Sequence, residues 1–173
     1  SILHKTNIEH GGEWIECRIL SSGARTNPWM QESSNKIIQA GEIVSFDTDM
    51  VGPYGYCADI SRTYVEGNKF SDNQKKLYLM AVEQINHNSR LIKPGMSFKE
   101  FTEKSWVLPE EYYGNRYSVM VHGIGLCDEW PAIRYPTDGG ERNGVFEKNM
   151  TITVESYIGK VGGKEGVKLE QQY

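Results

Sequence analysis

One long stretch of helical periodicity divides a chain that otherwise follows the pattern of β-strands. It runs from Asp72 to Ile92, and the pair Pro94-Gly95 ends it. The apolar or small residues on one face of this helix are expected to be Tyr78, Val82, Ile85, Ser89 and Ile92. Because strands precede and follow the helical part, the order of elements predicts an α+β fold with a mostly antiparallel sheet.

The expected strands are rich in β-branched and aromatic residues and cover residues 14–21, 37–51, 57–66, 117–121, 149–158 and 167–172. The segment MVGPYGY supplies Pro and Gly for a reversal, so residues 37–51 and 57–66 are expected to form a β-hairpin. A second helix is predicted from Ser97, whose hydroxyl can cap it while Glu100 completes a capping box.

Length and charge limit the function classes. With 173 residues, 38% of them hydrophobic, and no linker or repeat, we expect residues 1–173 to be a single domain. A net charge of -4 with interspersed signs disfavours nucleic acid and an anionic membrane as partners, and favours a small cationic or zwitterionic substrate. The chain begins with Ser1 instead of Met, so we expect that an amino-terminal part is missing.

Three cysteines at wide spacings, with no CxxC pair, argue against a disulfide framework and indicate a reducing compartment. No signal peptide is visible, and no apolar run approaches the roughly 18 residues of a membrane span. These observations predict a cytoplasmic protein.

Three aspartates concentrate on the predicted hairpin. Asp47 and Asp49 are two residues apart, so both carboxylates are expected on one face of their strand, and the returning strand brings Asp59 opposite them. Clustered carboxylates repel one another, so such a face needs either open solvent or bound cations. Exposed strand acids are therefore the alternative interpretation.

Two later strands and one strand end favour bound cations. Glu155 in TITVESY and Glu170 in VKLEQQ each interrupt an apolar or β-branched run, and His122 lies at the glycine-flanked strand end VHGIG. Carboxylates with one imidazole suit a pair of divalent first-row ions better than calcium. Arg62 in SRTY is expected either to pair with a ligand carboxylate or to face solvent.

The order Asp, Asp, His, Glu, Glu, in the settings FDTD, YCADISRTYVEG, HGIG, NMTITVES and KLEQQ, resembles the methionine aminopeptidase, prolidase and creatinase superfamily. The resemblance runs from about Glu13 to the end of the chain. It implies the pita-bread fold, with a curved sheet and helices on its outer face, in a truncated form. It also implies two metal ions held by the hairpin aspartates, His122, Glu155 and Glu170.

The register of the hairpin differs from the superfamily pattern. The peptidases usually place the second Asp eleven residues after the first, whereas Asp47 lies twelve and Asp49 ten residues before Asp59. Both Asp47 and Asp49 are therefore candidate ligands.

The peptidases also carry a second His seven residues after the metal-binding one and another before the first Asp. This chain has Glu129 at the first place and no His in GARTNPWMQE at the second. Without them, peptide hydrolysis loses groups that each contribute on the order of 10²-fold or more. The sequence therefore predicts that the metals are kept while the reaction differs.

Four segments, RILSSGARTNPWMQE, GEIVSFDTDMVGPYGYCADISRTY, HGIGLCDEWP and SYIGKVGGKEGVKLEQQ, resemble the dimethylsulfoniopropionate lyases of this superfamily, known as DddP. This resemblance implies cleavage of the substrate to dimethyl sulfide and acrylate, with Asp128 as the base and Tyr117 at the substrate. It also implies iron as the metal, a homodimer in the full-length protein and an additional amino-terminal domain that this chain lacks, so that residues 1–173 are the catalytic metal-binding domain. The implied metal ligands are Asp47, Asp49, Asp59, His122, Glu155 and Glu170.

The expected chemistry is consistent with these residues. Elimination needs a base for the proton next to the carboxylate and positive charge for the electrons that build up there, which two cations supply. The sulfonium group suits an aromatic face, with a cation–π attraction of about 0.5–2 kcal/mol. Candidate aromatic groups are Trp130, Trp29, Tyr117 and Tyr54, although Trp130 before Pro131 equally suits a core position.

Two other functions are consistent with the sequence. One is a dinuclear metal-dependent Xaa-Pro aminopeptidase or prolidase that uses Asp128 or Glu129 in place of the usual His. The other is a non-catalytic pita-bread module that binds a partner. Retention of every ligand type argues against the second, because a binding module has no need of acids that repel one another.

Overall fold

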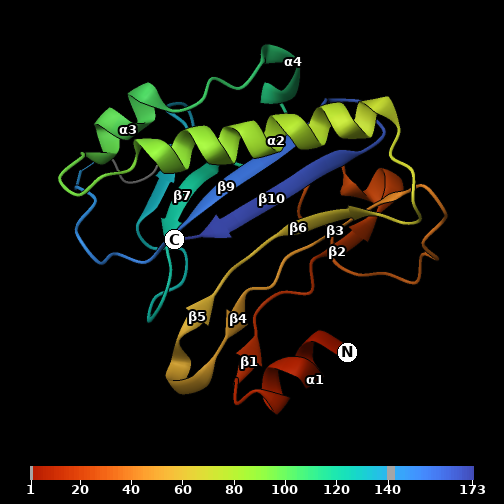
Figure 1. The fold of residues 1–173 in the computed structure, drawn as a ribbon, viewed down its shortest axis with the longest axis horizontal. Coiled ribbons are helices and arrows are strands. Elements are labelled where there is room, and N and C mark those ends of the chain that lie inside the picture. Colours follow the sequence, from red (N-terminus) through yellow and green to blue (C-terminus); the bar gives the residue numbers. More distant parts are fainter. Residues whose placement is uncertain (1, 140–142) are drawn as a thin grey trace.

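The four-stranded antiparallel sheet at the centre of the fold is covered on one face by a long helix. The computed structural model describes residues 2–139 and 143–173. The sheet has the order β10-β9-β7-β8, and helix α2 (Asp72–Leu91) lies across β9 and β10 (Figure 1). The strands are β7 (Val119–Gly123), β8 (Ala132–Arg134), β9 (Ile152–Gly159) and β10 (Gly166–Gln172). The predicted α+β class with an antiparallel sheet is confirmed.

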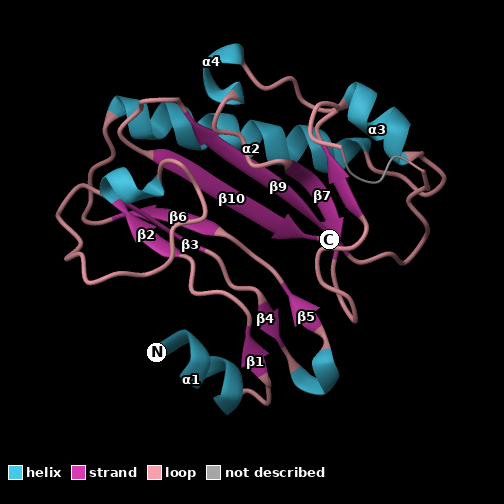
Figure 2. Ribbon diagram, turned by 180° about the vertical axis from the view of Figure 1, so that it is seen from behind, coloured by secondary structure: helices cyan, strands magenta, loops and turns pink. Residues whose placement is uncertain are grey.

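The predicted hairpin is present but is divided between two smaller sheets. One has the order β2-β3-β6 and the other the order β1-β4-β5, farther from α2 (Figure 2). Their strands are β1 (Trp14–Ile15), β2 (Leu20–Ser22), β3 (Ile43–Phe46), β4 (Met50–Val51), β5 (Cys57–Ala58) and β6 (Arg62–Val65). Residues 37–42 are not in a strand, so the prediction of one strand over residues 37–51 is wrong in its extent.

The division occurs where the three aspartates lie. Residues 47–49 have no strand pairing, and Asp49 has a positive φ of 32°, a region that Asp tolerates better than most residues. The Thr48 hydroxyl accepts a hydrogen bond from the backbone N–H of Ile60 at 2.9 Å. This side-chain contact takes the place of the missing ladder and holds the two broken segments together.

The remaining helices are short. They are α1 (Ile2–Glu9), α3 (Phe98–Lys104) and α4 (Glu110–Tyr113), with 3-10 turns at Gly23–Thr26 and Pro53–Gly55. The Ser97 hydroxyl caps α3 by accepting from the N–H of Glu100, whereas the reciprocal capping box is found at α2, between Ser71 and Gln74. No helix among the described residues is long and apolar enough to cross a membrane.

The buried face of α2 is more polar than the predicted stripe. Of that stripe only Ile85 is fully buried, and the centre of the interface also contains Gln84 and Asn88. Gln84 donates to the Tyr135 hydroxyl and accepts from Ser156, each at 2.7 Å. Polar groups that are hydrogen-bonded can be buried at low cost. The buried face of α2 therefore includes polar residues, and a prediction from apolar residues alone selects the adjacent face of the helix.

Strands β9 and β10 separate the core from the site. The residues that face α2 belong to the main hydrophobic core and include Val154, Ile158, Val167 and Leu169. Side chains alternate across a strand, so the residues between them project from the opposite face. That opposite face carries Thr153, Glu155, Tyr157, Lys168 and Glu170, all buried.

Several predicted boundaries shift by a few residues. The strand predicted at 117–121 is β7 at Val119–Gly123, and that predicted at 149–158 is β9 at Ile152–Gly159. The stretch 14–21 contains two short strands instead of one. Strand β8 and helices α1 and α4 were not expected.

Candidate metal centre

The sheet register brings three of the expected ligands together. Glu155 of β9 and Glu170 of β10 are directly opposite each other, and His122 of β7 is opposite Thr153, two residues before Glu155 on the same face. The Nε2 atom of His122 lies 3.3 Å from an oxygen of each glutamate. All three residues are almost completely buried.

The three aspartates of the divided hairpin lie next to His122 and the two glutamates. Asp59 lies between β5 and β6, and its carboxylate is 3.8 Å from His122 Nε2. Asp47 and Asp49 each place a carboxylate oxygen within 4.8 Å of one from Asp59. The two aspartates converge because the chain kinks at Asp49, and not because they alternate along a regular strand as the sequence suggested.

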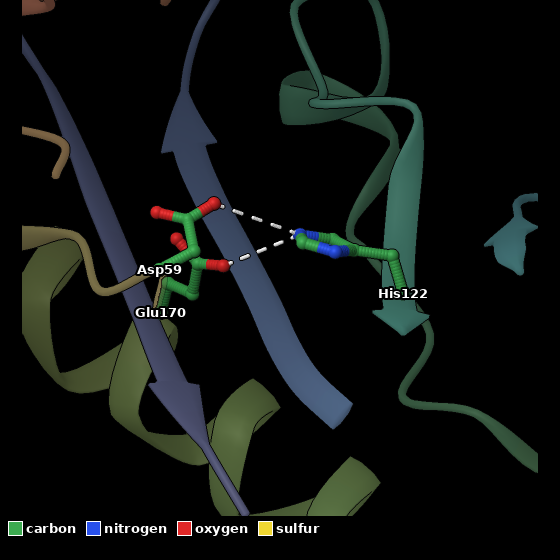
Figure 3. Close-up of side chains that lie close together, drawn as sticks. All are labelled: Asp59, His122 and Glu170. Carbon is green, nitrogen blue, oxygen red and sulfur yellow. Dashed lines mark ion pairs between the residues drawn. The ribbon is translucent and has the colours of Figure 1, made fainter. Parts of the chain in front are cut away.

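The ring of His122 directs its Nε2 atom at the carboxylates. Its Nδ1 lies 3.0 Å from the carbonyl oxygen of Gly123. A carbonyl can only accept, so Nδ1 carries a proton, and Nε2 is the nitrogen that a metal ion would engage in place of its proton. That buried Nε2 has no hydrogen-bond partner among the described residues, although Asp59 and Glu170 approach it (Figure 3). Such an atom is typical of a metal ligand.

The donor atoms form two overlapping groups. One contains Asp59, His122 and Glu170, and the other contains Asp47, Asp49 and Asp59. Asp59 is common to both, as a carboxylate shared by two ions would be. The set of carboxylates with one imidazole fits divalent transition metals, and the residues present can therefore hold such ions.

Burial and mutual repulsion shift the acidity of these groups. Burial, followed by the charges of Glu170 and Asp47, raises the pKa of Asp59 to about 12, and burial together with Glu170 raises that of Glu155 to about 7. Burial opposes a charged His122, yet the two glutamates outweigh it and raise its pKa to about 11. Protons and the protein's own cations therefore stabilise the cluster when it holds no metal.

A buried lysine, which the sequence analysis did not identify, lies beside the ligands. Lys168 is 1% exposed, and its Nζ is 2.5 Å from Glu155 Oε2, 3.5 Å from Glu170 Oε2 and 3.8 Å from Asp47 Oδ2. The Ser61 hydroxyl is 2.7 Å from the same Nζ and 2.6 Å from Asp47. The spacing Lys168-Leu169-Glu170 was the available signal, because residues two apart share a face of a strand.

Asp128 lies on the loop that follows β7. Burial, and then the charge of Asp49, raises the pKa of Asp128 to about 6, and His122 acts in the opposite sense. Gly123 allows this loop to fold back, because a Cβ at that position would lie 2.1 Å from the carbonyl oxygen of Trp130. The carbonyl of Gly125 accepts from the N–H of Cys57 at 2.7 Å, which joins the loop to β5.

The candidate aromatic residues differ in their surroundings. Tyr117 and Trp29 have their rings 5.1 and 5.3 Å from Lys168 Nζ, so both lie beside the ligands. Trp29 is buried in a small cluster with Ile19 and Tyr157. Trp130 is 60% exposed and Tyr54, at the tip of the β4–β5 hairpin, is 91% exposed. The core position considered for Trp130 is therefore excluded.

Arg62 supports the site through the backbone. Its guanidinium donates to the carbonyl oxygens of Glu170 and Ser61 and to the side chain of Gln171. It therefore ties β6 to the end of β10 instead of pairing with a ligand carboxylate. Glu170 is fixed from the main-chain side by this contact and from the side-chain side by the Thr153 hydroxyl, at 2.6 Å.

Comparison with known proteins agrees with this architecture. The family model described as metallopeptidase family M24 matches residues 1–173. The chain belongs to the M24 metallopeptidase family. Its carboxylate–histidine cluster thus lies in a protein of a metal-dependent family, and divalent metal binding follows from the family together with the ligand geometry.

Curated relatives within the M24 family include two lyases. The chain is 45% identical over 176 residues to dimethylsulfoniopropionate lyase DddP of Roseovarius nubinhibens and 43% identical to that of Roseobacter denitrificans. Each match covers 99% of this chain and 39% of the relative. The chain thus spans about two fifths of the length of these relatives.

Solved M24-like structures share the fold. The prolidase from Pyrococcus furiosus matches with a TM-score of 0.81 and 27% identity, over 99% of this chain and 50% of that one. The Xaa-Pro dipeptidase from Bacillus anthracis matches with a TM-score of 0.80 and 27% identity, over 95% of this chain and 45% of that one. The predicted pita-bread fold is confirmed, and the chain corresponds to about half of each solved structure.

Proposed function

We propose that the protein is a metal-dependent dimethylsulfoniopropionate lyase that forms dimethyl sulfide and acrylate by β-elimination. The observation that carries this is Asp128, a partly buried carboxylate with a pKa raised to about 6, on the loop next to the carboxylate–histidine cluster. A base is most effective when its pKa lies near the working pH. The similarity to the two lyases supports the same assignment.

The reaction needs one proton acceptor. Asp128 removes a proton from the carbon next to the substrate carboxylate, the electrons of that C–H bond form the carbon–carbon double bond, and the C–S bond breaks with its electron pair remaining on sulfur. Dimethyl sulfide leaves as a neutral molecule and needs no acid. The proton stays on Asp128 and passes to solvent before the next turnover.

Two divalent ions, when bound, supply positive charge for the electrons that build up on the substrate carboxylate. The proposed ligands are Asp47, Asp49, Asp59, His122, Glu155 and Glu170, and iron is the proposed metal. The buried Nε2 of His122, which has no hydrogen-bond partner among the described residues, and the carboxylate shared between the two groups of donor atoms support this assignment.

Tyr117 and the aromatic residues have separate proposed roles. Burial, followed by the charge of Glu155, raises the pKa of Tyr117 well above its usual value, so its phenol stays neutral and can donate a hydrogen bond to the substrate. The exposed rings of Trp130 and Tyr54 can accept the sulfonium by cation–π attraction. Trp29 lies deeper, against Lys168, and lines the inner side of the site in this proposal.

The proposal also covers the domain, the cellular location, the oligomeric state and the substrate class. Residues 1–173 act as one catalytic metal-binding domain, the protein is cytoplasmic and forms a homodimer, and its substrate is a small sulfonium zwitterion. The net charge of -4 is compatible with a small substrate that carries a positive charge.

A second candidate function is an Xaa-Pro aminopeptidase or prolidase, which the solved prolidase-like neighbours favour. The two functions are separated by supplying the metal-loaded protein, in its full natural length, with each substrate. Dimethyl sulfide and acrylate without cleavage of a proline dipeptide support the lyase. Release of free proline with no dimethyl sulfide supports the peptidase.

A further inference from the structure

The buried ammonium of Lys168 divides the two oxygens of Glu155 between different partners. Glu155 Oε1 lies 3.3 Å from His122 Nε2, on the side of the metal ligands. Its other oxygen, Oε2, lies 2.5 Å from Lys168 Nζ. A carboxylate whose second oxygen is engaged by a charged hydrogen bond has one oxygen free for a metal ion.

The ammonium of Lys168 also lies close to two other proposed ligands, Glu170 and Asp47. It is 3.5 Å from Glu170 Oε2 and 2.7 Å from the Ser61 hydroxyl. Ser61 in turn is 2.6 Å from Asp47 Oδ1 and 3.0 Å from Glu170 Oε2, and its single proton can serve one of them at a time. Lys168 and Ser61 thus contact three proposed ligands, which are Asp47, Glu155 and Glu170.

Lys168 is enclosed on its remaining sides. The rings of Trp29 and Tyr117 lie 5.3 and 5.1 Å from Nζ, within the range of cation–π attraction. Only 1% of the surface of the side chain is exposed to solvent. Three N–H donors and three nearby oxygen partners, from Glu155, Glu170 and Ser61, fix its orientation.

The positive charge of Lys168 also balances the net charge of the proposed metal centre. Five carboxylates, those of Asp47, Asp49, Asp59, Glu155 and Glu170, carry five negative charges when ionised, and the ammonium leaves a net of four. Two divalent ions neutralise four charges. A buried site is least costly when its charges balance.

We propose that Lys168 is a positioning residue of the metal centre, which holds Glu155 as a ligand through one oxygen only and orients Glu170 and Asp47. Lys168 can act in this way only if the metal centre proposed above exists, but its role does not depend on which reaction the metals serve. Partners that orient ligand carboxylates typically change metal affinity by about 10–100-fold when removed.

The test compares metal binding by four proteins, each in its full natural length: the wild type, Lys168→Met, Lys168→Arg and Lys160→Met. Lys160 is a matched control, because it is an exposed lysine whose side chain pairs with Glu111 at the surface. Co(II) is added to metal-free protein, and affinity is measured by competition with a chelator. The visible Co(II) spectrum reports the number of ligands.

The expected results are specific to a positioning role. Lys168→Met binds Co(II) about 10–100-fold more weakly, and its visible absorption decreases because the second oxygen of Glu155 is freed to become an additional ligand. Lys168→Arg restores binding to within a few fold of wild type, and Lys160→Met is unchanged. An ammonium also repels cations. Tighter Co(II) binding by Lys168→Met would mean that this repulsion in the wild type outweighs any gain from positioning the ligands, and that result overturns the positioning role.

Unchanged affinity and spectrum in Lys168→Met also overturn it. If Lys168→Met does not fold, Ser61→Ala tests the same contacts, with weaker Co(II) binding expected and wild-type binding contradictory. A wild-type protein that binds no Co(II) refutes the metal centre itself. Failure of the lyase reaction, with metal binding as described, leaves the assignment of Lys168 intact.

Discussion

Replacement of Asp128 by Asn tests the proposed base. The substitution keeps the size of the side chain and the oxygen that accepts from the N–H of Glu129 at 2.9 Å, but removes the proton acceptor. Turnover of dimethylsulfoniopropionate is expected to fall by at least about 10²-fold, the lower end of general-base contributions. This corresponds to about 2.7 kcal/mol of transition-state stabilisation. The loss should appear in kcat with little change in KM.

The raised pKa of Asp128 sets the pH dependence. With a pKa of about 6, the carboxylate is roughly 90% ionised at pH 7 and roughly 10% at pH 5. Only the ionised form accepts a proton, so kcat/KM should fall about tenfold between these values as the pH decreases. Asp128→Asn should lack this dependence.

Headspace measurement of dimethyl sulfide gives the rates, and elemental analysis shows whether metal content is unchanged. Glu129→Gln is the matched control, since Glu129 is the adjacent, exposed carboxylate, and it should stay within about twofold of wild type. Near-native turnover by Asp128→Asn with normal metal content would refute Asp128 as the base. A large loss in Glu129→Gln alone would transfer that role to Glu129.

Three further substitutions test other parts of the account. Glu170→Ala removes a proposed metal ligand whose carboxylate lies 3.3 Å from His122 Nε2, and it should abolish both metal content and activity. Full metal content in this variant would show that the ligand assignment is wrong. Gly123→Ala places a Cβ 2.1 Å from the carbonyl oxygen of Trp130 and should displace the Asp128 loop, so activity should fall at least tenfold in a protein with wild-type circular dichroism, and unchanged activity would contradict this. Phe146→Ala leaves a cavity beside Phe98 and Phe101, whose rings are 5.0 and 5.6 Å away, and should lower the free energy of unfolding in urea by about 3–5 kcal/mol; a loss below about 1 kcal/mol would mean that the site repacks.

Alternation along strands made much of the metal centre predictable. Glu155 and Glu170 interrupt apolar runs, and the structure shows them directly opposite each other on the buried face away from α2. The same rule would have identified Lys168, which lies two residues before Glu170. It was missed because a lysine in a strand is ordinarily exposed, and only the carboxylates around it explain its burial.

Other features depend on tertiary contacts that a linear pattern does not contain. The positive φ of Asp49 breaks the predicted strand, and the aspartates converge through that break. Gln84, on the buried face of α2, has its hydrogen-bond partners on distant segments, at Tyr135 and Ser156. A hydrophobic pattern cannot anticipate such partners.

The most direct test of the central claim is to incubate the metal-loaded protein, in its full natural length, with dimethylsulfoniopropionate and to measure dimethyl sulfide in the headspace and acrylate in solution. The account predicts that both products form in equal amounts and that formation stops when a chelator removes the metal. Absence of dimethyl sulfide from a protein with bound metal, together with cleavage of Xaa-Pro dipeptides, would contradict it.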